Sequence, residues 1–457
     1  MIKFLFFFVI SFACYIFRPL AYSNSYCIFL FLLYLVESLL FLKRMKVYGS
    51  INFHLFFILT NLVVIYLYPI FIYPVLPNFI LYFNSNYINQ GTALCHLSIL
   101  GYMIGAYHIS VKFSRTPQTV YVLNKKLPYW VVSLLWILVI CVTLSFLSQV
   151  GKTYGEIKKS DQLMSLIVVF ATVSLIWNSK YYSCKIYDLR SFVKYNFRII
   201  IPLVIYMGIS LIVGVRFSVL QVLLLLLVAY LMFVGQLKMR NFILLGFVGV
   251  MLFTFIAMTR NLTSDIKSSV DVVELYSNNN DREVSSIFYN LYDLICISRN
   301  LYVGAEYVEE EGYLYGQTFI PALFSAFPFL PSVSTAVLLD KTPKDVTTQY
   351  ILTQYSEKML GRLGFFVGTN CVIDIYMNIG FFLTICVFFI FGIIIQWLLM
   401  GYNRSFYLQC FYTILFSSSV FMVRGTIYDD LRSCIWCILL GFLIYKIKTK
   451  NGIQQYE

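Results

Sequence analysis

Twelve apolar runs, separated by polar breaks, follow one another along this sequence. A helix that crosses about 30 Å of hydrocarbon needs about 20 consecutive apolar residues. The runs lie near residues 2–18, 24–42, 53–73, 92–111, 129–149, 162–178, 198–214, 217–234, 241–259, 371–396, 406–423 and 433–446. Hydrophobic residues make up 60% of the chain and charged residues only 12%, whereas soluble domains carry about 25% charged residues. The sequence therefore predicts an all-α polytopic integral membrane protein with about twelve transmembrane helices, and it excludes soluble enzymes and secreted disulfide scaffolds.

The lysines and arginines predict the orientation of these helices. With the N-terminus inside, nineteen of the 34 basic residues fall in inner short loops and seven in outer ones. Because short cytoplasmic loops carry an excess of Lys and Arg, we expect both termini on the cytoplasmic side of the membrane. The net charge of +13 then reflects topology and contact with anionic membrane lipids, so nucleic acid is not expected as a partner.

One long polar segment divides the chain into three parts. Residues 1–259 hold predicted helices 1–9, residues 260–370 form a large loop on the outer side of the membrane, and residues 371–457 hold predicted helices 10–12 and a cytoplasmic tail. Loops of this length are commonly functional. Within the loop, the spacing of Ile287, Leu291, Leu294 and Ile295 predicts an amphipathic helix over 284–298 that lies on the membrane.

A second apolar stretch of the loop, Ile320–Pro331, holds three prolines and is too short to span. It is either an interfacial or re-entrant segment above a cavity, or a hydrophobic plug that docks the loop. With only three histidines in the chain, neither a metal site nor a cofactor is expected. The cysteines lie mostly inside apolar runs, where a thiol packs as a small hydrophobe.

Several short motifs around the loop resemble a known family. They are Pro331-Ser-Val-Ser, Asp340-Lys-Thr-Pro343, Phe365-Phe-Val-Gly-Thr-Asn370, Asp374-Ile-Tyr376 and Asn378-Ile-Gly380. Together with the topology, they resemble the oligosaccharide repeat unit polymerases of bacterial O-antigen (Wzy-type). Gly214-Val-Arg216 is similar to an arginine motif of the related O-antigen ligase and polymerase superfamily. A loop histidine that the ligases use is absent, since His54, His96 and His108 lie in earlier runs.

The resemblance implies an inverting, metal-independent glycosyltransferase at the periplasmic face of the inner membrane. The growing glycan would pass from undecaprenyl diphosphate to a lipid-linked repeat unit, forming O-antigen or a similar surface polysaccharide. The implied partners are this undecaprenyl-diphosphate-linked oligosaccharide, a chain-length regulator protein and the flippase that delivers repeat units.

Such a reaction needs cations that meet the developing charge of the diphosphate. Guanidinium groups bind phosphate oxygens bidentately, so arginines at the outer helix ends and in the loop are candidates. Arg216 and Arg424 are the preferred catalytic candidates, and the substrate-binding candidates are Arg260, Arg299, Arg362 and Arg432. The alternative for each is an arginine that only reaches toward lipid headgroups.

The acceptor hydroxyl must also lose a proton to a general base. Asn370, Asp374 and Asn378 recur every four residues and so predict one polar helix face. Asp374 is the preferred base, and the equally weighted alternative is a structural stripe that holds helices together. Glu357 and Tyr376 complete the substrate-binding candidates, while Asp429 and Asp430 remain further acids beside Arg424 and Arg432.

A second class of function is a lipid-linked oligosaccharide flippase. Glu37 is the one acid midway through an early apolar run, where a role in proton coupling would suit a transporter. Transporters are commonly built from two similar halves, and neither a repeat nor short loops throughout are found here. A membrane O-acyltransferase is a third possibility, but this chain has no histidine in its predicted outer segments that could act as the base.

Overall fold

The structure is a computed structural model that describes residues 2–112, 123, 125–147, 161–213, 215–235, 237, 240, 286–327, 329–361, 363 and 367–453. Every regular element in this part of the chain is a helix, which confirms the predicted all-α class. Seven helical segments are long and apolar enough to cross a membrane. They are Asn24–Tyr48, Phe53–Ile72, Ser85–Lys112, Tyr129–Phe146, Gln162–Tyr181, Leu189–Leu211 and Cys371–Arg404.

Eleven of the twelve predicted runs coincide with helices, and the run at 241–259 lies outside the described residues. Polar residues between the runs cap several of these helices. Ser23, Asn52 and Ser405 each accept a hydrogen bond from the backbone three residues ahead, which satisfies a backbone N–H that the first turn leaves unpaired. The number twelve stays a prediction, because the helices at the remaining coinciding runs do not combine the length and the hydropathy that mark these seven segments.

The chain forms two compact units, which are described separately. The first unit comprises residues 1–114, 248–397 and 420–429. Its helices are α1 (Ile2–Ile16), α2 (Asn24–Met45), η1 (Lys46–Tyr48), α3 (Phe53–Leu67), η2 (Tyr68–Ile72), η3 (Pro77–Phe79), η4 (Ser85–Tyr87), α4 (Ile88–Lys112), α11 (Ser286–Glu311), α12 (Phe319–Leu323), α13 (Leu330–Leu339), α14 (Thr348–Leu360), most of α15 (Cys371–Gly401) and η8 (Met422–Arg424).

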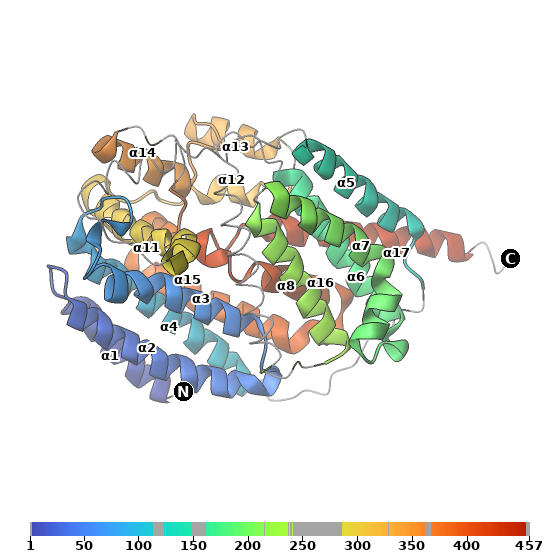
Figure 1. Cartoon of the computed structure of the whole chain (residues 1–457), viewed down its shortest axis with the longest axis horizontal. Coiled ribbons are helices and arrows are strands. Elements are labelled where there is room, and N and C mark those ends of the chain that lie inside the picture. The colour runs from blue at the N-terminus through green and yellow to red at the C-terminus, as the bar shows by residue number, and fades with distance from the viewer. Residues whose placement is uncertain are drawn as a thin grey trace. The chain divides into compact units, whose positions relative to one another are not determined.

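Helix α4 forms the centre of the first unit. It contacts α1, α2, α3 and α11, with α1–α4 running side by side in blue to cyan in Figure 1. It also meets α15 at two glycines, where the backbones touch. A Cβ atom built on Gly105 would lie 2.0 Å from the carbonyl oxygen of Phe389, and one on Gly392 would lie 2.1 Å from that of Tyr102. Small residues of this kind allow membrane helices to approach closely.

We expect Gly392→Ala to destabilise the first unit, because its added methyl group would collide with backbone rather than with a side chain that can turn away. Overpacking of this kind costs about 1–3 kcal/mol. Gly208 is the matched control, since a Cβ there meets nothing within 4 Å. Gly208→Ala should leave the thermal unfolding temperature unchanged or raise it, as alanine favours helix over glycine. Equal unfolding temperatures for the two purified variants would contradict this packing argument.

The long helix of the loop differs from its prediction. Helix α11 extends beyond the predicted 284–298 to Glu311 and packs against α3, α4 and α14. Of the four residues that predicted an amphipathic face, Ile295 is the one whose side chain is described, and it is fully buried. Residues 297–305 are buried as well. The described half of α11 is therefore part of the protein interior and does not lie on a membrane surface.

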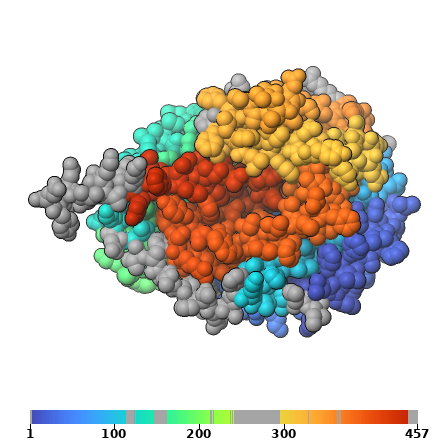
Figure 2. All heavy atoms as spheres, turned by 180° about the vertical axis from the view of Figure 1, so that it is seen from behind, coloured from blue at the N-terminus to red at the C-terminus, as the bar shows by residue number. Residues whose placement is uncertain are grey.

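The proline-containing stretch is exposed instead. Residues 320–331 form α12, a turn and the start of α13, and Ala326 is the one buried residue among those described. Large apolar side chains of residues 320–331 are exposed, among them Leu323, Phe327 and Phe329. This exposure favours the interfacial interpretation over a plug buried in the protein. Figure 2 shows the loop helices in yellow to light orange beside α15 in orange.

The second unit comprises residues 115–247, 398–419 and 430–457. Its helices are α5 (Tyr129–Leu147), α6 (Asp161–Tyr181), η6 (Ser183–Lys185), α7 (Leu189–Val213), α8 (Arg216–Phe233), η7 (Tyr402–Arg404), α16 (Phe406–Ser418) and α17 (Leu431–Ile453). Helix α6 contacts α5, α7, α8, α16 and α17, and apolar side chains from all six α-helices form one core.

Candidate functional site

A polar face at the start of α15 joins the loop to the membrane helices. Asn370, Asp374 and Asn378 are all buried, and all three bind residues outside α15. Asn370 also caps α15, because its Oδ1 accepts a hydrogen bond from Val372 N. The predicted common face is confirmed.

The Asp374 carboxylate accepts hydrogen bonds from three hydroxyl groups, which belong to three different segments. Thr318, just before α12, donates to Oδ1 over 3.3 Å, and Thr348, at the start of α14, donates to the same oxygen. Tyr428 donates to Oδ2 over 2.6 Å. Asp374 itself is fully buried. A carboxylate needs such donors when it is removed from water, so this arrangement holds α12, α14 and the segment around Tyr428 onto α15.

The two asparagines form further hydrogen bonds beside this network. Asn378 Nδ2 donates to Thr318 Oγ1 over 2.7 Å, while its Oδ1 is buried without a hydrogen-bond partner in the described residues. Asn370 Nδ2 donates to the carbonyl oxygen of Val423 over 2.9 Å. The latter bond fixes the backbone directly before Arg424.

The turn after η8 presents two charged groups at the surface. Arg424 is exposed, and its guanidinium makes no ion pair or side-chain hydrogen bond within the described part of the chain. Asp429 is exposed too, and its carboxylate accepts hydrogen bonds from Thr426 N over 2.9 Å and Thr426 Oγ1 over 2.7 Å. Gly425 lies beneath this carboxylate, since a Cβ there would be 2.7 Å from Asp429 Oδ2. The turn therefore holds an oriented carboxylate and an available guanidinium within six residues.

Tyr428 connects this exposed turn to buried Asp374. Burial, followed by the charge of Asp374 and the hydrogen bond to it, raises the pKa of Tyr428 far above its ordinary value. The phenol therefore keeps its proton and remains a donor at neutral pH. Asp374 thus supports the turn through Tyr428 while lying away from solvent.

The other predicted residues of the first unit have different surroundings. Arg299 is buried, with Nε donating to the carbonyl oxygens of Leu81 and Tyr82 and both Nη atoms donating to Ser356 Oγ. Glu357, near the end of α14, accepts a hydrogen bond from Leu363 N. These contacts tie protein segments together.

Tyr376 is buried, and its ring centroid lies 6.2 Å from that of Tyr313. Arg260 and Arg362 lie outside the described residues.

Arg216, Asp430 and Arg432 belong to the second unit. Arg216 begins α8, where its backbone is described. Asp430 is buried and accepts a hydrogen bond from Ser418 Oγ over 2.8 Å. The predicted arginines and acids are therefore divided between the units.

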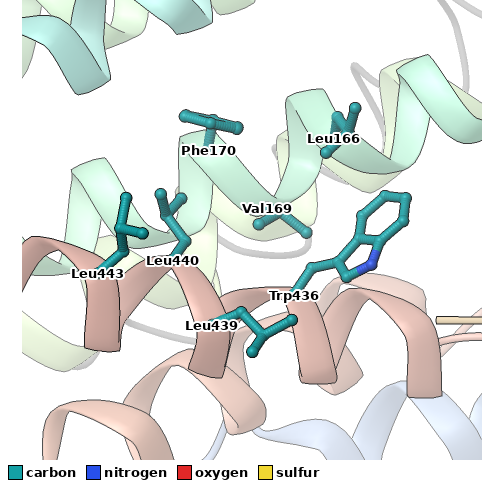
Figure 3. A pocket seen from close by; sticks show the side chains of 7 residues that line it. All are labelled: Leu166, Val169, Phe170, Trp436, Leu439, Leu440 and Leu443. Atoms are coloured by element: carbon teal, nitrogen blue, oxygen red, sulfur yellow. The ribbon is translucent and has the colours of Figure 1, made fainter. Parts of the chain in front are cut away.

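An open apolar groove of about 280 Å³ lies between α6 and α17 in the second unit (Figure 3). It is lined by Leu166, Val169, Phe170, Trp436, Leu439, Leu440 and Leu443. Arg432 stands one turn before Trp436, with its guanidinium carbon 5.6 Å from the Trp436 ring centroid and Nη2 donating to Ser165 Oγ over 3.0 Å.

Thr318, Thr348 and Tyr428 were not singled out from the sequence, although Tyr428 directly precedes the candidate acid Asp429. No group of three metal-binding side chains lies close together in the part of the chain that the structure describes. Comparison with protein-family models, with curated proteins and with solved structures found no match.

Proposed function

We propose that this protein polymerises undecaprenyl-diphosphate-linked oligosaccharide repeat units at the periplasmic face of a bacterial inner membrane. The observation that carries the proposal is the surface turn with exposed Arg424 and the oriented Asp429 carboxylate. Glycosyl transfer from a diphosphate without a metal needs these two groups, a cation for the leaving group and a base for the acceptor. The motif resemblance described above supports the same reaction.

In the proposed reaction, an acceptor hydroxyl oxygen attacks the anomeric carbon of the donor glycan. The bond between this carbon and the diphosphate oxygen breaks, and the configuration inverts. Asp429 takes the hydroxyl proton, and the Arg424 guanidinium binds the diphosphate oxygens as their negative charge grows. The departing product is undecaprenyl diphosphate.

The burial of Asp374 changes the role that we propose for it. A general base must come within hydrogen-bonding distance of the proton that it removes, and the carboxylate oxygens of Asp374 already accept three hydroxyl donors in the protein interior. We therefore assign proton removal to Asp429 and the positioning of the turn to Asp374.

Deletion of the gene in its host tests the function. A polymerase deletion should reduce the ladder of surface glycan on a gel to a single repeat unit, and the gene on a plasmid should restore the ladder. An unchanged ladder would reject the proposal. Loss of every repeat unit would identify the alternative, a lipid-linked oligosaccharide flippase.

A further inference from the structure

Residues 312–339 form the longest uncharged stretch of the large loop. No Asp, Glu, Lys or Arg occurs among them, whereas Glu309, Glu310 and Glu311 directly precede them and Asp340 and Lys341 follow. Surfaces that face water carry about 25–35% charged residues. Three prolines prevent the stretch from crossing a membrane as one helix, and it forms the two short helices α12 and α13. Its composition therefore does not suit a surface that faces water.

The two helices leave most of their large apolar side chains uncovered. Helix α12 packs against α13, and no other described helix packs extensively on either one. The exposed side chains form what we call the apolar face, which consists of Leu323, Phe327, Phe329, Val333, Val337 and Leu338. An exposed apolar surface of this kind marks contact with lipid or with protein.

The backbone is strained where it holds two aromatic rings out of the protein. Tyr315 and Phe329 have φ angles of 50° and 65°, and each side chain is 83% exposed. The left-handed region is costly for residues with a Cβ atom, above all for bulky ones. Such strain persists where the surroundings or the function compensate for it. Water does not compensate for an exposed phenyl ring, whereas an apolar environment does.

Hydrogen bonds place the start of α12 beside the first turns of α15, a helix long and apolar enough to span a membrane. Leu314 N donates to the carbonyl oxygen of Met377 over 2.8 Å, and Thr318 Oγ1 donates to Asp374 and accepts from Asn378. Helix α15 has 31 residues, so it is about 46 Å long at 1.5 Å per residue. The hydrocarbon core is about 30 Å thick. When the last turns of α15 reach one headgroup region, its first turns and the start of α12 therefore lie in the other.

The start of α12 also touches the turn that carries Arg424 and Asp429. The hydroxyl oxygens of Thr318 and Tyr428 lie 3.3 Å apart. The ring centroid of Phe319 lies 5.5 Å from that of Tyr428. The position of α12 therefore affects the position of this turn.

We propose that the apolar face of α12 and α13 inserts into the outer lipid leaflet and holds the turn of residues 424–429 at the level of the lipid phosphates. Insertion removes the apolar face from water, which is favourable. Tyr315, with an apolar ring and a polar hydroxyl, suits the boundary between acyl chains and headgroups. The partner is the acyl-chain region of the leaflet, and the task of the two helices is to fix the height of the turn.

The task at the turn rests on the proposed glycan polymerisation, because a lipid-linked diphosphate carries its charge at this level. Insertion itself does not rest on it, since insertion is measured in vesicles that hold no glycan. A failed polymerase test would leave the insertion result intact, and a failed insertion test would leave the polymerase activity to be judged by its own assay.

Spin labels on the purified protein in vesicles of phosphatidylethanolamine and phosphatidylglycerol test the insertion. Val337→Cys labels the apolar face, Ile390→Cys labels an exposed apolar position within α15, and Lys358→Cys labels an exposed charged position on α14. The background protein serves as the labelling blank and lacks the exposed cysteines Cys141, Cys184 and Cys386.

Oxygen concentrates among acyl chains and a nickel chelate stays in water, so the ratio of the two accessibilities reports the surroundings of each label. We expect the ratio at Val337 to exceed that at Lys358 and to approach that at Ile390. A Val337 ratio equal to that at Lys358 would overturn the proposal, because the face would lie in water. An immobile Val337 label that neither reagent reaches would also overturn it, because another segment of this chain or a second copy would then cover the face.

A label at Arg424→Cys tests the height of the turn. Val337→Asp places a charge on the apolar face, which is costly among acyl chains, so the label should become more accessible to the nickel chelate. Val337 is 76% exposed, and its replacement therefore removes little packing. Tyr187→Asp is the matched control, because Tyr187 is 78% exposed and belongs to the second unit; it should leave the label unchanged. An unchanged label in Val337→Asp would reject the positioning of the turn by the two helices.

Discussion

Arg424→Lys is expected to lose most of the glycan transfer activity while the protein still folds and inserts. Lysine keeps the positive charge but lacks the planar fork that binds two phosphate oxygens. Loss of one preorganised contact to a developing charge typically lowers the rate about 10²–10³-fold. The Arg424 side chain is exposed and makes no side-chain hydrogen bond within the described residues, so its thermal unfolding should not change. The measurement is transfer between lipid-linked repeat units by purified protein, together with the unfolding temperature.

Arg216→Lys is expected to behave in the same way, since Arg216 begins α8 with no other charged residue nearby in the sequence. Arg299→Lys is the contrasting control. The Arg299 guanidinium is buried against backbone carbonyl oxygens and Ser356, so its replacement should lower stability and activity together. If cells with Arg424→Lys and cells with Arg216→Lys both produced the wild-type ladder of surface glycan, these arginines would have no role in transfer and would only contact lipid headgroups.

Asp429→Asn is expected to lower transfer by about 10²–10⁴-fold, the usual contribution of a general base. The amide keeps the shape of the side chain, and its oxygen can still accept the hydrogen bond from Thr426 N while its nitrogen donates to Thr426 Oγ1, but it cannot take a proton at neutral pH. Binding of the lipid-linked substrate should remain close to normal. Gly425→Ala offers a second route to the same effect, because its Cβ would displace the Asp429 carboxylate without changing its chemistry.

Asp374 variants distinguish a positioning residue from the base. Asp374→Asn retains an acceptor oxygen for the hydroxyl groups of Thr318 and Thr348, and its amide nitrogen can donate to the Tyr428 hydroxyl, so we expect a folded protein with most of its activity. Asp374→Leu removes the carboxylate acceptor of three hydroxyl groups, at about 1–3 kcal/mol for each donor left without a partner, and should lower the unfolding temperature. An inactive but stable Asp374→Asn beside an active Asp429→Asn would reverse the assignment and make Asp374 the base.

Much of the fold follows from local properties of the sequence. The apolar runs are visible residue by residue, and eleven of the twelve are helices, the twelfth lying outside the described residues. The polar face of Asn370, Asp374 and Asn378 was equally predictable, because residues four apart share one side of a helix. The environment of α11 was not predictable in this way. Its apolar spacing suits either a membrane surface or a protein interior, and only its contacts with α3, α4 and α14 decide between them.

In the candidate site, too, some properties follow from the local sequence and others only from tertiary contacts. The sequence by itself determined that Asp374 lies on a polar helix face and that Arg424, Asp429 and Asp430 lie close along the chain. Only the tertiary structure decided that Asp374 is buried under three hydroxyl groups, that Asp429 is exposed and that Asp430 belongs to a different unit.

The contact between Glu37 Oε2 and His96 Nε2, 3.3 Å apart and both fully buried, depends even more on tertiary structure, because the two residues are 59 positions apart in sequence and meet through the packing of α2 against α4. Periodicity determines which side of a helix a residue occupies. Which neighbour covers that side depends on contacts between distant segments, and these contacts determine the burial, the hydrogen bonds and the charge state of each group.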